Sequence, residues 1–214
     1  MNRYDRTHFE RLYERDPDPW NFRTSAYEQS KYAATIASLV RPRYAKALEL
    51  GCSIGMLTQR LASICGEVVA VDTSARALAT ARQLCRCANV SFRQAHLPGG
   101  EWGAGFDLVV LSEILYYLDV PALEVLARRI QTVMLPGAEC IAVHWTGATD
   151  YPLSGDRASG LFRTMLPGTS LVYRRTPHYR LESWHPAKHH PSRSERPRKH
   201  PPGSQEHGCA RETR

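Results

Sequence analysis

Two periods of hydrophobic positions alternate along the first 146 residues. Short apolar runs, typical of buried strands, are separated by segments whose apolar side chains recur every three or four positions, as on one face of a helix. Strands are predicted at residues 46–50, 68–71, 90–95, 106–111 and 139–145. Helices are predicted at residues 25–40, from Gly55 onward, from the capping residues 72–74 to 87, and from Asp119 to about 137. This alternation implies a doubly wound parallel sheet.

The end of the chain departs from this alternation. A helix is predicted at residues 153–166, and two extended segments follow at 170–175 and 179–184, joined by a short Thr-Pro-His turn. The turn favours a hairpin added to the parallel strands. The predicted fold class is therefore α/β, with a doubly wound, mostly parallel seven-stranded sheet that ends in a C-terminal β-hairpin.

The 214 residues suffice for one sizeable α/β domain but hardly for two. We expect an N-terminal helical segment or lid (residues 1–45), a core (46–184) and a basic tail (185–214). The tail holds seven Lys and Arg against three Asp and Glu, which is +4 of the net charge of +7. Its few apolar residues predict disorder. It is read as a solvated extension, so no nucleic-acid partner is expected; a tether to a nucleic acid or an acidic surface is the alternative.

Composition also bears on the cellular setting. No run of about 18 apolar residues would span a membrane, and the polar N-terminus is unlike a secretory signal. The six cysteines include no C-x-x-C pair, which favours reduced thiols over disulfides or a zinc site. We therefore expect a cytoplasmic protein without membrane insertion and without a metal ion. The sequence does not predict its oligomeric state.

Residues 47–58, A-L-E-L-G-C-S-I-G-M-L-T, carry the main chemical signal. A strand ends in an acid, Glu49, and Gly51 and Gly55 precede the next helix, an arrangement that brings backbone close to a ligand at a helix N-terminus. Asp72 ends the next strand about 20 residues further on, where a ribose-binding carboxylate is expected. The glycines and Asp72 indicate a nucleotide-like cofactor, and Glu49 favours one with a cationic amino-acid tail.

Four motifs in order resemble those of the class I S-adenosylmethionine-dependent methyltransferases: E-L-G-C-S-I-G, V-V-A-V-D, F-D-L-V-V-L-S-E and L-P-G-A-E-C-I-A-V, over residues 47–143. More narrowly, D-P-W-N-F, Y-E-Q-S-K-Y, E-L-G-C-S-I-G-M-L-T and S-E-I-L-Y-Y-L are similar to segments of the nodulation methyltransferases of NodS type, over residues 9–184. Two positions depart from the broad class. Ser53 replaces a third glycine, and His96-Leu97 stand where an acid often receives the adenine amino group.

This resemblance implies a Rossmann-like methyltransferase fold. It implies S-adenosyl-L-methionine as the methyl donor, with S-adenosyl-L-homocysteine as product. It further implies a rhizobial enzyme that N-methylates the free amine of a de-N-acetylated chito-oligosaccharide during Nod factor biosynthesis.

The motifs suggest roles for individual residues at the cofactor. Glu49 is expected to bind the amino group, directly or through water, and Asp72 both ribose hydroxyls, although each carboxylate would also suit a turn or a cap. Gly51 and Gly55 are expected to allow close backbone approach. Further cofactor contacts are expected from Cys52, Ser53, Thr73, His96, Leu97 and Ser112.

Two more cofactor contacts are expected from outside these motifs. Arg23, in preference to Lys31, is expected to hold the cofactor carboxylate, although both would also suit solvated charges. Trp102, in the glycine-rich loop before residue 106, is expected to cover the adenine.

On the acceptor side, methyl transfer needs a neutral amine aligned with the methyl carbon and the sulfur, so a nearby proton acceptor helps. Glu113 is the first candidate, with a surface carboxylate as the alternative. His144, near the end of its strand, is the second, although such a histidine is at least as often a hydrogen-bonded core residue. Because sugars stack on aromatic faces, substrate contacts are expected from Trp20, Tyr27, Tyr116 and Tyr117.

Two other classes of function are considered. An NAD(P)-dependent oxidoreductase shares the strand, turn and helix but predicts G-x-G-x-x-G, and Ser53 and Glu49 argue against it. A non-catalytic nucleotide-binding protein with a basic interaction tail is disfavoured by Glu113 and His144. Within the methyltransferases, another small amine or hydroxyl acceptor is the alternative to the oligosaccharide.

Overall fold

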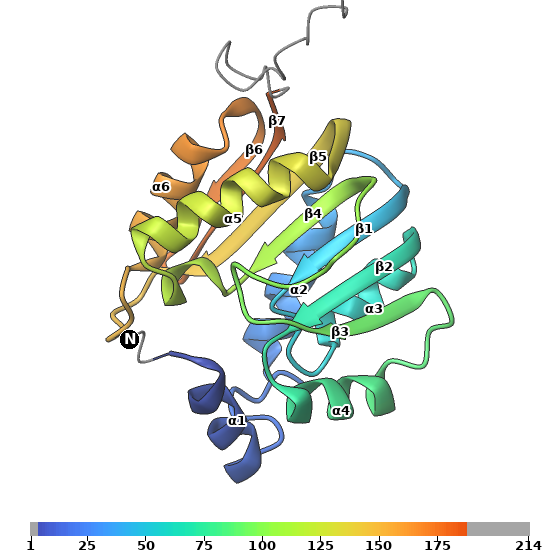
Figure 1. Cartoon of the computed structure of the whole chain (residues 1–214), viewed down its shortest axis with the longest axis vertical. Helices are drawn as coiled ribbons and strands as arrows, with labels where there is room; N and C mark the ends of the chain where they lie inside the picture. Colours follow the sequence, from blue (N-terminus) through green and yellow to red (C-terminus); the bar gives the residue numbers. More distant parts are fainter. Residues whose placement is uncertain (1–3, 188–214) are drawn as a thin grey trace, which may run out of the picture.

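The computed structural model describes residues 4–187, which form one seven-stranded sheet with helices on both faces (Figure 1). The sheet order is β3-β2-β1-β4-β5-β7-β6, in which β7 runs antiparallel to β5 and β6 antiparallel to β7. The strands are β1 (Tyr44–Leu50), β2 (Cys65–Asp72), β3 (Val90–Gln94), β4 (Phe106–Ser112), β5 (Met134–Trp145), β6 (Gly168–Arg175) and β7 (Tyr179–Pro186). The predicted doubly wound sheet with a closing hairpin is confirmed.

Alternate residues of the central strands point to opposite faces, as the pleat requires. Leu48 and Leu50 join the core under α5 and α6, whereas Ala47 joins the core under α2, α3 and α4. The helices are α1 (Arg6–Arg15), α2 (Ala26–Ala37), α3 (Met56–Ala62), α4 (Ala75–Leu84), α5 (Val120–Val133) and α6 (Gly155–Met165), with a short 3₁₀ helix, η1 (Leu115–Tyr117). In Figure 1, α5 and α6 cover the near face, and α1 lies next to α4.

Side-chain caps begin the helices at the predicted places. The hydroxyls of Ser25 and Ser74 and the carboxylate of Asp119 each accept a hydrogen bond from the first turn of their helix. The ends fall earlier than predicted: α2 stops at Ala37 and α4 at Leu84. A helix end has no comparable side-chain signal here, which explains the overrun.

Two elements differ from the sequence prediction. α1 is absent from the predicted helices, although Phe9, Leu12 and Tyr13 recur at helical spacing and Asp5 caps its first turn. β5 begins at Met134 rather than at residue 139, because Met134 already pairs with Phe106 across a register shift in β4. The chain therefore passes from α5 directly into β5, through the segment predicted to end the helix.

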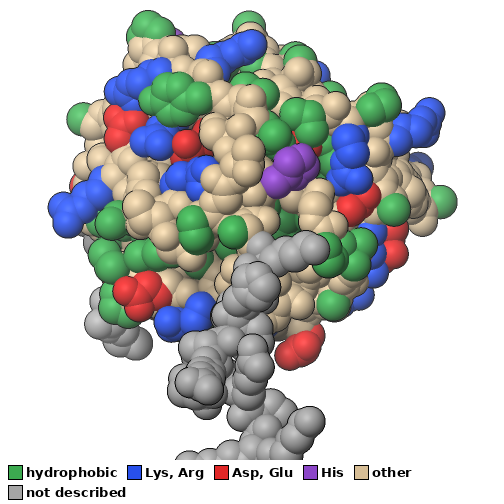
Figure 2. All heavy atoms as spheres, turned by 90° about the horizontal axis from the view of Figure 1, so that it is seen from above, with side chains coloured by type: hydrophobic (Ala, Val, Ile, Leu, Met, Phe, Trp, Pro, Cys, Tyr) green, Lys and Arg blue, Asp and Glu red, His purple; other side chains and the backbone are tan. Residues whose placement is uncertain are grey.

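The hairpin reaches further than predicted. β7 ends at Pro186, and Ala187 donates a backbone hydrogen bond to Pro167, so residues 185–187 belong to the folded core rather than to the tail. The rest of the predicted tail, residues 188–214, lies outside the described residues. Among residues 4–187, no helix is long and apolar enough to cross a membrane. On the face shown in Figure 2, basic and acidic side chains are interspersed.

The topology fixes where a site can form. β1 lies between β2 and β4, so the chain order reverses at the boundary between β1 and β4. In open parallel sheets, ligands bind beside the carboxyl ends of the strands at such a reversal. Glu49, Asp72 and Glu113 all lie at that edge, at or just after the ends of β1, β2 and β4.

Candidate functional site

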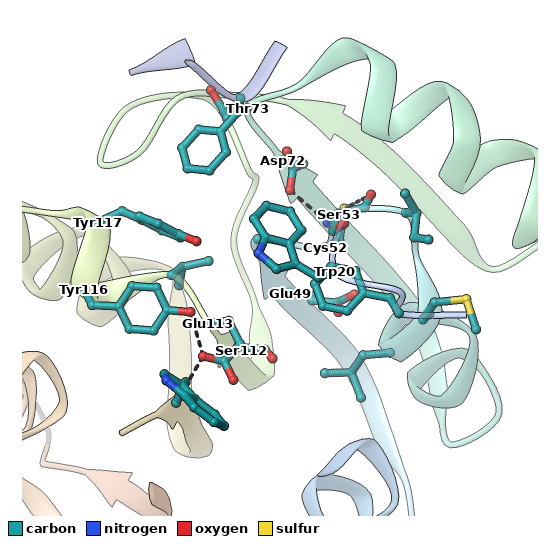
Figure 3. A pocket seen from close by; sticks show the side chains of 18 of the residues that line it. Trp20, Glu49, Cys52, Ser53, Asp72, Thr73, Ser112, Glu113, Tyr116 and Tyr117 are labelled. Atoms are coloured by element: carbon teal, nitrogen blue, oxygen red, sulfur yellow. Dashed lines mark hydrogen bonds between the residues drawn. The ribbon is translucent and has the colours of Figure 1, made fainter. Parts of the chain in front are cut away.

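A cavity of about 400 Å³ opens at the carboxyl ends of β1, β2 and β4, and residues of the N-terminal segment also line it. In Figure 3, Trp20 lies between the Asp72 and Ser53 pair on one side and the Glu113 and Tyr116 pair on the other. The predicted site residues that line the cavity are Trp20, Tyr27, Glu49, Gly51, Cys52, Ser53, Asp72, Thr73, His96, Leu97, Ser112, Glu113, Tyr116 and Tyr117. Four do not line it: Arg23, Gly55, Trp102 and His144.

The glycine turn forms the floor of the cavity. Gly51, Ser53 and Gly55 all have left-handed backbone conformations, with φ of +83°, +49° and +81°. Gly51 is also pressed against the loop after β4, where an added Cβ would lie 1.9 Å from Ile114 Cγ2. A non-glycine residue in this region costs about 1 kcal/mol, so Ser53 needs compensating contacts.

Ser53 receives those contacts from two directions. Its backbone N–H donates to Asp72 Oδ2 at 2.8 Å, and its hydroxyl shares a hydrogen bond with the buried Tyr13 hydroxyl of α1. The serine hydroxyl therefore ties the turn to α1. Tyr13 is not among the predicted site residues; its spacing from Phe9 marks it only as part of an apolar helix face.

Asp72 holds the turn with both of its oxygens. Oδ2 accepts from Ser53, and Oδ1 accepts from the Ser74 N–H at 2.9 Å. Burial raises the pKa of this carboxyl, while the backbone N–H groups of Ser74 and Ser53 oppose the shift. A carboxylate has about four acceptor positions, so these two bonds leave capacity for a ligand.

Glu49 is 1 % exposed and accepts a hydrogen bond from Thr58 Oγ1 at 2.6 Å. Burial raises its pKa to about 7, with a further contribution from Asp72, while the Thr58 bond acts in the opposite direction. The carboxyl is thus close to half ionised at neutral pH, and a nearby cation would favour its charged form.

Glu113 lies in the cavity as predicted, but its carboxylate is already engaged. Oε1 accepts from the Lys31 ammonium, and Oε2 accepts from the Tyr116 hydroxyl at 2.7 Å and from the Trp145 backbone N–H at 2.8 Å. Burial raises the pKa of Glu113, but the charge of Lys31, His144 and the hydrogen bonds from Lys31 and Trp145 outweigh it, and the net pKa is lowered. Glu113 is therefore an ionised anchor rather than a ready proton acceptor.

His144 is fully buried behind η1, so the prediction that it acts as a base is not supported. Nε2 accepts from the Leu115 N–H at 3.1 Å and from Ile114, and Nδ1 contacts Ser159 Oγ at 3.2 Å. Burial lowers its pKa to about 4. Its ring fixes the start of η1 and thereby the position of Tyr116. His144 is therefore a hydrogen-bonded core residue.

Three other predicted site residues also lie outside the cavity. Arg23 is exposed and outside the cavity, whereas Lys31, the less favoured alternative, is 2 % exposed inside it. Gly55 begins α3, and an added Cβ would lie 3.2 Å from Ala81 Cβ, so it serves the packing against α4. Trp102 is buried beneath the Arg129 guanidinium and does not line the cavity.

Aromatic side chains wall both ends of the cavity. Trp20 stacks on Phe22 with ring centroids 5.4 Å apart, and Tyr116 stacks on Tyr151 at 4.9 Å. Tyr151 comes from the loop after β5, where the hydrophobic pattern gave no signal. Other lining aromatics that were not anticipated are Tyr4, Phe9, Tyr13 and Tyr32.

Comparison with known proteins finds curated relatives that share one description. Curated relatives are the nodulation protein S of Sinorhizobium fredii, 30% identical over 144 residues (66% of this chain and 65% of that protein), and that of Bradyrhizobium diazoefficiens, 33% identical over 122 residues (56% and 58%). The matched regions thus span less than two thirds of the length of these relatives.

Solved structures give the same fold. A structure described as a putative methyltransferase from Pseudomonas syringae is 32% identical, with a TM-score of 0.67, and the match covers 75% of this chain and 99% of that one. The N-methyltransferase NodS from Bradyrhizobium japonicum WM9 in complex with S-adenosyl-L-homocysteine has a TM-score of 0.72 at 21% identity, over 84% and 98%. The Rossmann-like methyltransferase fold is thereby confirmed.

A family model described as nodulation protein S (NodS) matches residues 7–146, which include the glycine turn, Asp72, Glu113 and His144. This match covers more than half of the 214 residues. The resemblance seen in the sequence motifs is confirmed, and the chain belongs to the NodS family.

Proposed function

We propose that the protein is an S-adenosylmethionine-dependent N-methyltransferase that methylates the free amine of a de-N-acetylated chito-oligosaccharide in Nod factor biosynthesis. The observation that carries the proposal is one cavity in which the Glu49, Gly51 and Asp72 cradle faces a wall of buried charges and aromatic rings. Membership of the NodS family and the S-adenosyl-L-homocysteine complex of the Bradyrhizobium japonicum enzyme support it.

The cradle fits the proposed cofactor. Asp72 has acceptor positions left for two ribose hydroxyls, and Glu49 is a buried carboxylate whose pKa of about 7 a neighbouring ammonium would lower. Gly51 presents bare backbone to the cavity. When bound, S-adenosylmethionine supplies an electrophilic methyl group on a sulfonium, and the side chains of this protein hold it and exclude water.

The acceptor end fits an amino sugar. Trp20 and the Tyr116–Tyr151 stack offer flat aromatic faces, which suit pyranose rings. We propose that residues 1–45, of which 4–45 are described, form the cover of the site, since Tyr13 and Trp20 both line it. A cytoplasmic location is part of the proposal; all five described cysteines are free thiols, which suits a reducing compartment.

Calorimetry with the purified protein tests the cofactor assignment. S-adenosylmethionine and S-adenosylhomocysteine are expected to bind, and NADH is not, since the turn is built for an amino-acid tail rather than a pyrophosphate. Binding of NADH without binding of either adenosyl ligand would overturn the proposal.

Cofactor binding is also expected to depend on pH. The ionised form of Glu49 is the one that binds an ammonium, and its fraction rises with pH through the pKa of about 7. The affinity for S-adenosylhomocysteine should therefore increase about tenfold between pH 6 and pH 8. Calorimetric titrations at both pH values measure this increase. Glu49→Gln, which keeps an acceptor for Thr58, serves as control and should show no such step; an equal step in both proteins would assign the titration to another group.

A further inference from the structure

Two polar atoms in the cavity wall have no hydrogen-bond partner among the described residues. They are Glu28 Oε2 and the Tyr27 hydroxyl oxygen, both buried and both from the first turn of α2. Both residues line the cavity. Buried polar atoms are nearly always paired in folded proteins, so two adjacent exceptions that line one cavity point to a ligand that completes them.

The charges around Glu28 indicate the sign of that ligand. Glu28 Oε1 accepts from the Lys31 ammonium at 2.9 Å, and the same ammonium binds Glu113. One cation is thus shared by two carboxylates, all three largely buried, with side-chain exposures of 2 % for Lys31, 11 % for Glu28 and 16 % for Glu113. The cluster is short of one positive charge when both acids are ionised, and an ammonium would balance it.

Glu28 differs from Glu113 in having a carboxylate oxygen that is available to bind a ligand. The Glu113 oxygens are engaged by Lys31, Tyr116 and Trp145. Oε2 of Glu28 has no partner within hydrogen-bond distance among the described residues, and the Tyr32 hydroxyl acts on this carboxyl only as a weaker neighbour. Burial raises the pKa of Glu28, with Glu113 adding to the rise, and Lys31 and Tyr32 only partly oppose it. Glu28 therefore takes up a proton more readily than Glu113, whose pKa is lowered.

We infer that Glu28, and not Glu113, is the carboxylate that binds the ammonium of the methyl acceptor and takes its proton, with the Tyr27 hydroxyl as a second acceptor for the same nitrogen. This inference rests on the proposed function. Glu113 and Lys31 position Glu28: Lys31 holds its Oε1, and Glu113 holds Lys31.

The step balances as follows. The acceptor R–NH3⁺ gives one proton to the Glu28 carboxylate and becomes R–NH2. The nitrogen lone pair then forms the N–C bond to the methyl group while the C–S bond breaks. The electron pair of the C–S bond stays on sulfur. The products are R–NH2⁺–CH3, S-adenosylhomocysteine and a protonated Glu28, which returns its proton to water when the site opens.

The test compares Glu28→Gln with Glu113→Gln, the same chemical change at the other end of Lys31. In the wild type with bound S-adenosylhomocysteine, a fully de-N-acetylated chitotriose should bind at least about tenfold more tightly than its N-acetylated form. Glu28→Gln should lose this preference, and its kcat should fall about 100-fold. Its affinity for S-adenosylhomocysteine should be unchanged. Its kcat/KM should also lose the acidic limb that Glu28 gives the wild-type pH profile.

Glu113→Gln should keep the preference for the amine. Glu28→Asp keeps a carboxylate and should restore part of it, which preserves the test if Glu28→Gln folds poorly. A Glu28→Gln variant that still prefers the amine would overturn the inference and leave the proposed function standing. A variant that loses affinity for S-adenosylhomocysteine instead would assign Glu28 to the cofactor's amino group, and also overturn it. A wild type that does not methylate the amine would reject the proposed function itself.

Discussion

Gly51→Ala is expected to destabilise the protein by about 3 kcal/mol or more. The added Cβ would lie 1.9 Å from Ile114 Cγ2 and 3.3 Å from the Ser112 carbonyl oxygen, so the loop after β4 must move. The φ of +83° adds the cost of a left-handed residue. Chemical denaturation measures the loss, and calorimetry should show that binding of S-adenosylhomocysteine is lost with it.

Gly105→Ala is the matched control. Its φ of +82° is nearly the same, but nothing lies within 4 Å of an added Cβ, so only about 1 kcal/mol should be lost. The double variant Gly51→Ala/Ile114→Ala should lose less than the sum of its parts, because the second change removes the atom that collides. Equal losses for Gly51→Ala and Gly105→Ala would show that close packing against Ile114 does not matter.

Lys31→Met is expected to cost about 3–5 kcal/mol, because it leaves Glu28 and Glu113 buried without their shared cation. Lys46→Met is the control. Lys46 pairs with Glu67 at 3.3 Å on the surface, and its loss should cost less than about 1 kcal/mol. Urea unfolding of both variants provides the comparison.

The loss of stability in Lys31→Met is expected to depend on pH. In the wild type the pKa of Glu113 is lowered, so its stabilising contribution is present at neutral pH and is lost as the pH falls. In Lys31→Met the largest opposing cause is lost, while the hydrogen bonds from Tyr116 and Trp145 still oppose burial. The pKa of Glu113 should then rise above its unfolded value, so its contribution is present at low pH and is lost as the pH rises. The gap between the two proteins should therefore narrow from pH 7 to pH 5. A gap that stays constant would mean that the carboxylates are not the groups destabilised.

The sheet and the cofactor cradle could be predicted because local signals fix them. Short continuous apolar runs predicted the strands. A glycine turn after β1 and an acid at the end of β2 meet at one edge in any doubly wound sheet. The helix α1 carries a weaker signal, since only Phe9, Leu12 and Tyr13 lie at helical spacing among seven polar residues.

The charge cluster could not be predicted, because it depends on contacts between distant segments. Lys31 and Glu113 are 82 positions apart, and only the packing of α2 beside the end of β4 brings them together. Nor does a histidine at the end of a buried strand reveal which way it faces. His144 points under η1 rather than into the cavity, and that direction depends on Ser159 from α6.

The most direct test of the proposed activity follows the methyl group. The protein is incubated with S-adenosylmethionine labelled with ¹³C in the methyl group and a de-N-acetylated chito-oligosaccharide, and the product is examined by NMR. We expect an N-methyl signal on the formerly free amine, absent with the fully N-acetylated oligosaccharide and absent with Asp72→Ala. Label on a hydroxyl oxygen, or no label in the sugar while S-adenosylmethionine binds, would contradict the account.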